Sequence, residues 1–335
     1  MFSATTTQTS DQNVSSTTIL APGKIVTGVR GMDDSNVVLT GSGSVNGITT
    51  AFLYVGPPSP TNDAGMYALP PVFDGQTVTA STYYGPDTFK FNPGLGAGNV
   101  RAVGSYQYAD SGARNHGMMY EGPPAGGGVW TQIDVPPGAV GGQSVANTIA
   151  HSTMGDLVVG NYDLHGDPLS ANAFIYNVTK GTWTLFDFGD DVSLITAYGI
   201  WQNEIGGAAY TIVGGAKDGA GLNKGFLVRY DSETGSFSQL TWYTYNNDPA
   251  VVTHFEGITA VPGGFHLAGG SGAASATFIF IPVKPDGSFG EAAWTPFAFP
   301  GAELTTGNTI YRNLMMGLYV LPDKAGTGTY LATFG

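Results

Sequence analysis

The sequence has no cysteine, and this excludes disulfide bridges, thiolate metal sites and a cysteine nucleophile together. Charged side chains are also scarce: they make up 11% of the 335 residues, with 12 Lys and Arg against 25 Asp and Glu and a formal net charge of -13. Because phosphate binding needs a basic surface, we expect no nucleic-acid partner. No apolar run approaches the roughly 18 residues of a membrane span, so we expect no membrane-spanning segment.

The start of the chain lacks the basic and apolar regions of a signal peptide and is rich in Ser and Thr. An acidic surface with few lysines is common outside the cell. We therefore expect a secreted protein, extracellular or periplasmic, from which a leader has been removed. We predict a polar N-terminal segment over residues 1–14 and a single domain over residues 15–335.

Glycine and proline are abundant, with 51 and 20 residues, and they follow no collagen period. This excess indicates many tight turns between short strands. Hydrophobic residues make up 42% of the chain, enough for a sizeable core. Packing and closure of the chain on itself must therefore supply the stability that disulfides would otherwise give.

Self-similarity is the main signal in the sequence. A short apolar run ending in glycine recurs at intervals of roughly 50–60 residues, the scale of propeller repeats. A second apolar run and a third run with an aromatic residue follow it, separated by turns rich in Gly, Asp and Asn. With the run that precedes it, each unit has the four strands of a propeller blade. The glycine-ending runs are VVLTG (37–41), RAVG (101–104), LVVG (157–160), TIVGG (211–215), FHLAGG (265–270) and LMMG (314–317).

The last unit lacks its fourth strand. It ends with GTYLATFG (328–335), and the missing strand matches SSTTILAPGK (15–24) near the other end of the chain. We predict an all-β, six-bladed β-propeller of four-stranded antiparallel blades, whose last blade is closed by an N-terminal strand with residues 17–20 beside residues 330–334. Such closure leaves no exposed sheet edge. The alternatives are a β-sandwich, a parallel β-helix, or a propeller with five or seven blades.

Three units share a further pattern. LVVG leads to NAFIYNVTKGTW (172–183), RAVG leads to HGMMY (116–120), and VVLTG leads to TTAFLY (49–54). This pattern resembles the repeats of extracellular HAF-type proteins, in which a glycine-ending strand precedes a strand with His, Ala and Phe and then a Gly-Trp segment. The glycine pairs at 214–215 and 269–270 also resemble kelch repeats. Both resemblances imply a propeller, and neither implies a reaction.

The first strand of each blade lines the central channel of a propeller, so we expect the functional residues at a mouth of that channel. The polar and aromatic side chains near these strands differ between blades, as a single asymmetric site requires. They offer the cations, carboxylates, imidazoles and aromatic faces that hold a polar small molecule. We predict ligand-binding roles for Arg30, Tyr84, Trp201, Glu256, Tyr311 and Arg312.

Four residues are candidates for catalysis. His151 and His254 are predicted general bases, because an imidazole titrates near neutral pH. Asp34 and Glu204 are predicted as a separated acid/base pair of the glycosidase sort. The structural alternatives are a histidine bonded to the channel wall and a carboxylate that caps its own turn. No local spacing supports a metal site, and no cofactor is predicted.

Two other features concern loops. Residues 85–99 form a loop longer than a usual hairpin, and loops of this size are often functional lids. We predict that Phe89, Lys90 and Phe91 cover one mouth of the channel; a decorative insertion or a subunit contact is the alternative. Sequons for N-glycosylation stand at Asn13 and Asn177.

Two classes of function fit these observations. The first is a secreted propeller that binds a polar small molecule or a glycan at its channel mouth, or serves as an interaction scaffold for a protein partner. The second is a hydrolase or lyase with one asymmetric acid/base site at the channel. The sequence has no Gly-x-Ser-x-Gly elbow and no other motif that specifies a reaction, which favours the binding role.

Overall fold

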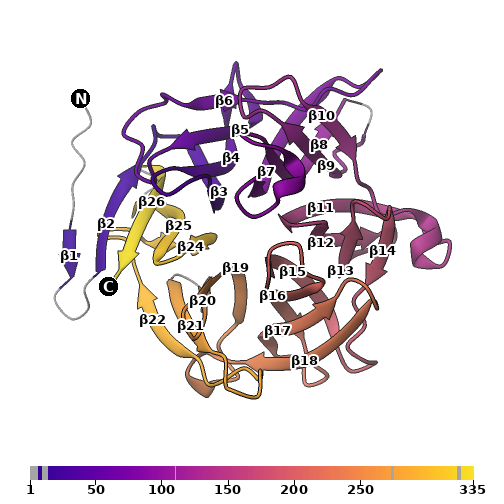
Figure 1. The fold of residues 1–335 in the computed structure, drawn as a ribbon, viewed down its shortest axis with the longest axis vertical. Helices are drawn as coiled ribbons and strands as arrows, with labels where there is room; N and C mark the ends of the chain where they lie inside the picture. The colour runs from indigo at the N-terminus through magenta and orange to yellow at the C-terminus, as the bar shows by residue number, and fades with distance from the viewer. Residues whose placement is uncertain (1–6, 10–13, 110, 273–274, 323–325) are drawn as a thin grey trace.

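The fold is a six-bladed β-propeller (Figure 1), seen here in a computed structural model that describes residues 7–9, 14–109, 111–272, 275–322 and 326–335. Six antiparallel sheets surround a central channel. The six-bladed fold predicted from the repeat is confirmed. Asn13 and most of the predicted N-terminal segment lie outside the described residues.

Five blades follow one another along the chain, and each begins at the channel and runs outward. Blade one comprises β3 (Lys24–Gly31), β4 (Val37–Val45), β5 (Ile48–Gly56) and β6 (Met66–Ala68). Blade two comprises β7 (Val78–Thr88), β8 (Val100–Tyr108), β9 (His116–Gly122) and β10 (Val129–Gln132). Blade three comprises β11 (Val145–Met154), β12 (Leu157–Leu164), β13 (Asp167–Asn177) and β14 (Thr182–Leu185). Blades four and five comprise β15 (Ser193–Gln202), β16 (Ala209–Lys217), β17 (Asn223–Asp231) and β18 (Ser236–Tyr243); β19 (Thr253–Val261), β20 (Gly264–Ser271), β21 (Ala276–Pro282) and β22 (Ala293–Phe297).

The sixth blade joins the two ends of the chain. Strand β2 pairs antiparallel with β26, from Val14 opposite Phe334 to Ile19 opposite Thr329, so the predicted closure is confirmed. A further short strand, β1, pairs with the outer edge of β2. The blade comprises β23 (Leu304–Thr305), β24 (Thr309–Tyr311), β25 (Leu314–Val320), β26 (Thr327–Phe334), β2 (Val14–Ile19) and β1 (Thr7–Thr9).

The turns between strands follow from their polar residues. In the β17–β18 turn, Asp231 Oδ1 accepts the backbone N–H groups of Glu233 (3.0 Å) and Thr234 (2.8 Å). Gly235 completes the turn at φ 71°, in the left-handed region that glycine enters without steric cost. The sequence YDSETGSF thus makes a hairpin because its side chains satisfy the turn locally.

Each inner strand of blades one to five carries a β-bulge at the same place. The bulged residues are Thr27, Tyr84, His151, Tyr198 and Glu256. Bulges re-aim side chains, and these five residues are all half-buried at the channel.

A glycine follows the bulge in four of these strands, at Gly28, Gly85, Gly199 and Gly257. A Cβ at Gly28 would lie 2.2 Å from the Tyr84 carbonyl oxygen, and one at Gly257 would lie 2.9 Å from the Thr309 Cα. Only glycine permits neighbouring inner strands to approach this closely. The channel is narrow for this reason.

The hydrophobic core lies between the faces of neighbouring blades. Strand alternation directs Phe174, Phe226 and Phe255 into these layers, where each is fully buried. In the described part of the chain, no helix is long and apolar enough to cross a membrane.

Candidate functional site

The channel is lined by residues from all six inner strands, but it has little free volume. The cavity inside it measures about 30 Å³. That is room for about one or two water molecules. A small-molecule ligand can therefore occupy a mouth of the channel and not its interior.

Four aromatic rings from consecutive inner strands form a row along the wall of the channel. Tyr84 lies 5.0 Å from His151, His151 lies 4.5 Å from Tyr198, and Tyr198 lies 6.0 Å from His254, measured between ring centroids. Burial lowers the pKa of His151 to about 4, although the negative charge of Glu256 opposes the shift. His151 is therefore neutral at physiological pH, and burial together with Glu256 raises the pKa of Tyr198 to about 12.

One mouth, where the inner strands begin, carries a histidine paired with a carboxylate. His254 Nε2 lies 2.6 Å from Glu256 Oε1, and both side chains are partly exposed, at 36% and 28%. Burial alone would lower the pKa of His254, but the hydrogen bond and the charge of Glu256 outweigh it and raise the pKa. The pair thus favours the protonated form of His254.

The pair lines a pocket of about 240 Å³ at this mouth. Thr306 and Asn308 stand opposite on the segment that leads into β24. Thr306 Oγ1 donates to Asn308 Oδ1 at 2.6 Å, and Asn308 Nδ2 donates to the Val26 carbonyl oxygen at 3.2 Å. These contacts fix the polar side chains of the pocket before any ligand arrives.

The opposite mouth is closed by the loop after β7, which projects over the centre of the ring in Figure 1. Phe91 lies 5.6 Å from Trp201 and 6.2 Å from Tyr311, between ring centroids. Below them, the Arg30 guanidinium lies 5.1 Å from the Trp201 ring and 5.9 Å from the Phe91 ring. The lid interpretation of this loop agrees with the position of Phe91.

The loop is shorter than we predicted from the sequence. Gly85–Thr88 belong to β7, and only residues 89–99 leave the sheet. Lys90 ties the loop to blade one through an ion pair with Asp34, with Nζ 3.0 Å from Oδ1.

The predicted site residues divide between the two ends of the channel. Four of them lie along the channel wall toward the mouth where the inner strands begin, which we call the open mouth: Tyr84, His151, His254 and Glu256. The others lie at or beyond the closed end: Arg30, Trp201 and Tyr311 are buried there, while Asp34, Glu204 and Arg312 are exposed in the turns that follow β3, β15 and β24.

The prediction that these residues converge on one mouth is therefore corrected. An inner strand of eight residues, such as β3, is about 26 Å long, so residues at its start and at its end face different mouths. Asp34 is 98% exposed and pairs with Lys90, and neighbouring Asp33 caps its turn by accepting the N–H groups of Ser35 and Asn36. The catalytic roles assigned to Asp34 and Glu204 stay predictions, but these carboxylates cannot act beside His254.

Sequence reasoning missed Tyr198, Thr306 and Asn308. A signal for Tyr198 was present, because a residue before a glycine marks the bulge in four inner strands, as in Tyr84-Gly85 and Tyr198-Gly199. Asn308 lacks this glycine signal, because Thr309 follows it. Thr306 does precede a glycine, Gly307, but lies before the start of β24. Among the described residues, no group of three or more His, Asp and Glu is placed to hold a metal ion.

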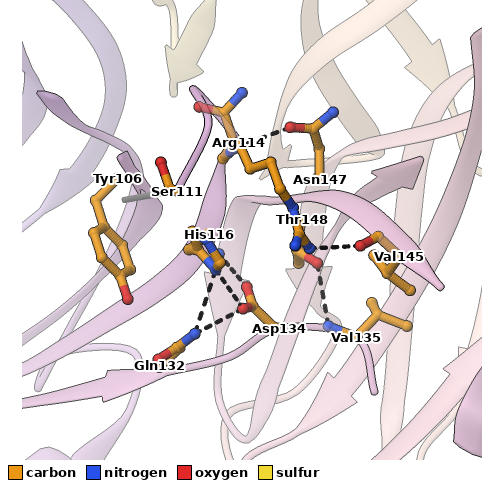
Figure 2. A network of polar contacts seen from close by, with 12 residues as sticks. Tyr106, Ser111, Arg114, His116, Gln132, Asp134, Val135, Val145, Asn147 and Thr148 are labelled. Carbon is orange, nitrogen blue, oxygen red and sulfur yellow. Dashed lines mark hydrogen bonds and ion pairs between the residues drawn. The ribbon is translucent and has the colours of Figure 1, made fainter. Parts of the chain in front are cut away.

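A second histidine–carboxylate pair lies in blade two, away from the channel (Figure 2). His116 Nδ1 lies 2.6 Å from Asp134 Oδ2, and Asp134 also accepts the Gly117 N–H (2.8 Å) and the Gln132 side-chain N–H (2.7 Å). His116 is 6% exposed. Arg114, from the same edge, donates to the Ala146 carbonyl oxygen of blade three at 2.7 Å. This network joins blades two and three.

We predict that Glu256→Gln lowers the pKa of His254 below the ordinary value of about 6.5, because burial then acts without the carboxylate. In the wild-type protein the pKa of His254 should lie above 6.5. Because a raised folded-state pKa stabilises the fold below the unfolded pKa, this contribution should fade as the pH rises through the His254 pKa. NMR titration of the histidine C–H signals measures the pKa of His254 in the wild type and in Glu256→Gln, with exposed His165 as the internal control. An unchanged His254 pKa in the variant would contradict the pairing.

Comparisons with known proteins come from structure alone, since no protein-family model and no curated protein matches this chain. A Trypanosoma rangeli sialidase in complex with the inhibitor DANA superposes with a TM-score of 0.50 at 8% identity, over 93% of this chain and 54% of that chain. A mutant of the same sialidase displaying trans-sialidase activity gives 0.52 at 8% identity, over 99% and 57%. Prolyl oligopeptidase B from Galerina marginata gives a TM-score of 0.38 at 12% identity, over 87% and 38%.

This chain spans little more than half the length of the two sialidases. The resemblance of the repeats to HAF-type and kelch sequences is not tested by these matches and stays a prediction. At 8% identity, the likeness to the sialidases shows a shared propeller fold and no more.

Proposed function

We propose that this protein binds a small polyhydroxylated ligand, the size of one sugar ring, at the open mouth of its channel. The observation that carries the proposal is the His254–Glu256 pair, joined at 2.6 Å and facing a pocket of about 240 Å³. Pockets for drug-sized ligands measure about 300–1,000 Å³, so this one suits a smaller molecule. The narrow channel behind it keeps the ligand at the mouth.

The chemistry of the pocket matches hydroxyl groups. The Glu256 carboxylate accepts hydrogen bonds from hydroxyls, and a protonated His254 donates them, both with the extra strength of a charged partner. Thr306, Asn308 and Ser275 add neutral donors and acceptors around the same space. A ligand with many hydroxyls uses all of these groups, whereas an apolar ligand would leave them unpaired.

A valine in place of Gly270 should block this site. A Cβ at Gly270 would lie 3.2 Å from His254 Cε1, so the larger side chain fills the pocket beside the imidazole. The matched control is Gly138→Val, where an added Cβ meets no atom within 4 Å. Isothermal titration with D-glucose, D-galactose, D-mannose, N-acetyl-D-glucosamine and N-acetylneuraminic acid measures binding; the last is included because the similar folds are sialidases.

We expect saturable binding of at least one of these sugars to the wild type and to Gly138→Val. Gly270→Val should lose it, and Glu256→Gln should weaken it about tenfold, the effect of one charge-assisted hydrogen bond. Binding that survives in Gly270→Val, or no binding of any of the five sugars, would contradict the proposal.

A hydrolase acting at the same mouth is the second candidate. A histidine hydrogen-bonded to a carboxylate is the arrangement of a positioned general acid or base, and water is the available nucleophile. Release of 4-methylumbelliferone from its glycosides tests this candidate. Turnover that His254→Gln abolishes would assign catalysis to the pair, and absence of turnover in the wild type would leave the binding role.

A further inference from the structure

A cavity larger than the channel-mouth pocket lies between the outer parts of blades four and five. None of the residues that line it lines the channel. We call it the outer groove. It measures about 520 Å³, within the range of ligand pockets. Trp242 lines it from β18 of blade four, and Trp294 lines it from β22 of blade five. Both indoles are half-buried, so each presents part of its surface to the groove.

Packing against neighbouring aromatic rings holds these indoles in place. Trp294 stacks on Phe255 with the ring centroids 6.0 Å apart at 27°, and the edge of Tyr245 approaches it at 5.5 Å. Trp242 meets Phe188 edge-on at 5.9 Å. Rigid aromatic surfaces bind at a low cost in conformational entropy, and their apolar faces match the C–H faces of sugar rings.

The polar side chains of the groove are hydroxyls, two amides and one charge of each sign. Asn246 and Asn247 are exposed and lie in the left-handed region, with φ of 49° and 59°. This conformation is uncommon outside glycine, and asparagine adopts it more readily than most other residues. Lys284 and Glu291 are also exposed at the groove, and their charges cancel. The groove therefore favours an uncharged ligand with many hydroxyls.

We propose that the outer groove binds an uncharged oligosaccharide, with sugar rings against Trp242 and Trp294 and hydroxyls bonded to the amides of Asn246 and Asn247. Its volume is more than twice that of the channel-mouth pocket, which suits a chain of sugars better than a single ring. The inference does not depend on the function proposed for the mouth, since the two sites share no lining residue.

Tryptophan fluorescence reports on the groove directly, because two of the five tryptophans line it. The probes are cellohexaose, xylohexaose, mannohexaose and chitohexaose, with hexagalacturonate as a charged comparison. We expect a saturable change with at least one of the four neutral probes. Trp294→Ala should weaken that binding at least tenfold, while Trp183→Phe in blade three should leave it unchanged.

A second variant tests the groove independently, in case Trp294→Ala does not fold. Replacing Asn246 and Asn247 together by glycine removes both amides and keeps the left-handed backbone. This variant should bind at least threefold more weakly. Gly270→Val, which blocks the channel mouth, should bind the probe normally, so failure of one proposal is distinguishable from failure of the other.

Three outcomes would overturn the inference. They are no saturable change with any neutral probe, wild-type affinity in the folded double-glycine variant, and tighter binding of hexagalacturonate than of every neutral probe.

Discussion

Replacing Asp87 by alanine is expected to destabilise the protein by about 3–5 kcal/mol, because it leaves the buried Arg30 guanidinium without its counter-charge. Asp87 is fully buried between Arg30 and Arg101, each 4% exposed. Its carboxylate also accepts the N–H groups of Thr88 and Gly155, both at 2.9 Å. The substitution removes these acceptors together with the charge.

Asp87 connects three segments at the closed mouth: β3 through Arg30, β8 through Arg101, and the turn after β11 through the Gly155 N–H group. Burial raises its pKa, and the two arginines and the two N–H donors oppose that shift. Urea unfolding of wild type and variants measures the change in the free energy of unfolding. Asp87→Asn should cost less than alanine, because the amide oxygen still accepts one N–H group. The control is Asp34→Ala, at a 98% exposed side chain, which should cause no measurable change. Equal stability of Asp87→Ala and wild type would contradict the account of this buried cluster.

Removal of residues 1–20 is expected to lower the free energy of unfolding by about 5 kcal/mol or more. The deletion takes away β2, and with it the buried side chains of Val14, Ile19 and Leu20. Each contributes about 1.5–3 kcal/mol by burial. It also exposes the edge of β26, which carries fully buried Tyr330. Thermal and urea unfolding measure the effect, which is a large part of a domain's total stability.

The matched control deletes residues 1–13 and keeps β2. Within the described residues, strand β1 pairs with the outer edge of β2 and with no other strand, so its loss should change stability much less. Similar midpoints for the two deletions would contradict closure by β2. Aggregation of the longer deletion at its open edge is the accompanying expectation.

The architecture was predictable because each blade buries its strands in the same way, and the sequence repeats accordingly. The apolar runs ending in glycine became the second strands, where Gly41, Gly104 and Gly214 face the backbone of the inner strand: a Cβ at Gly214 would lie 1.7 Å from the Thr196 carbonyl oxygen. The split blade was predictable because the last unit lacked a fourth strand after β26, and the segment around β2 matched that missing strand in sequence.

The site was harder to predict, because it depends on which end of a strand each residue occupies. Asp87 lies in the sequence GPDT, which is typical of a turn, yet tertiary packing extends β7 through it. The sequon at Asn177 was hard to interpret for a similar reason, because the sequence does not show whether the fold buries its asparagine. It is 9% exposed and its Oδ1 accepts the Lys180 N–H at 2.9 Å, so the sequon forms a turn within the fold.

The most direct test of the central claim follows the histidine C–H signals by NMR while the sugar that binds best in calorimetry is added. His254 should shift saturably, with the dissociation constant that calorimetry gives, because it lines the pocket at the open mouth. His116 and His165, which lie away from the channel, should not move. A shift of His116 or His165 without one of His254 would contradict the account and place the ligand elsewhere on the propeller.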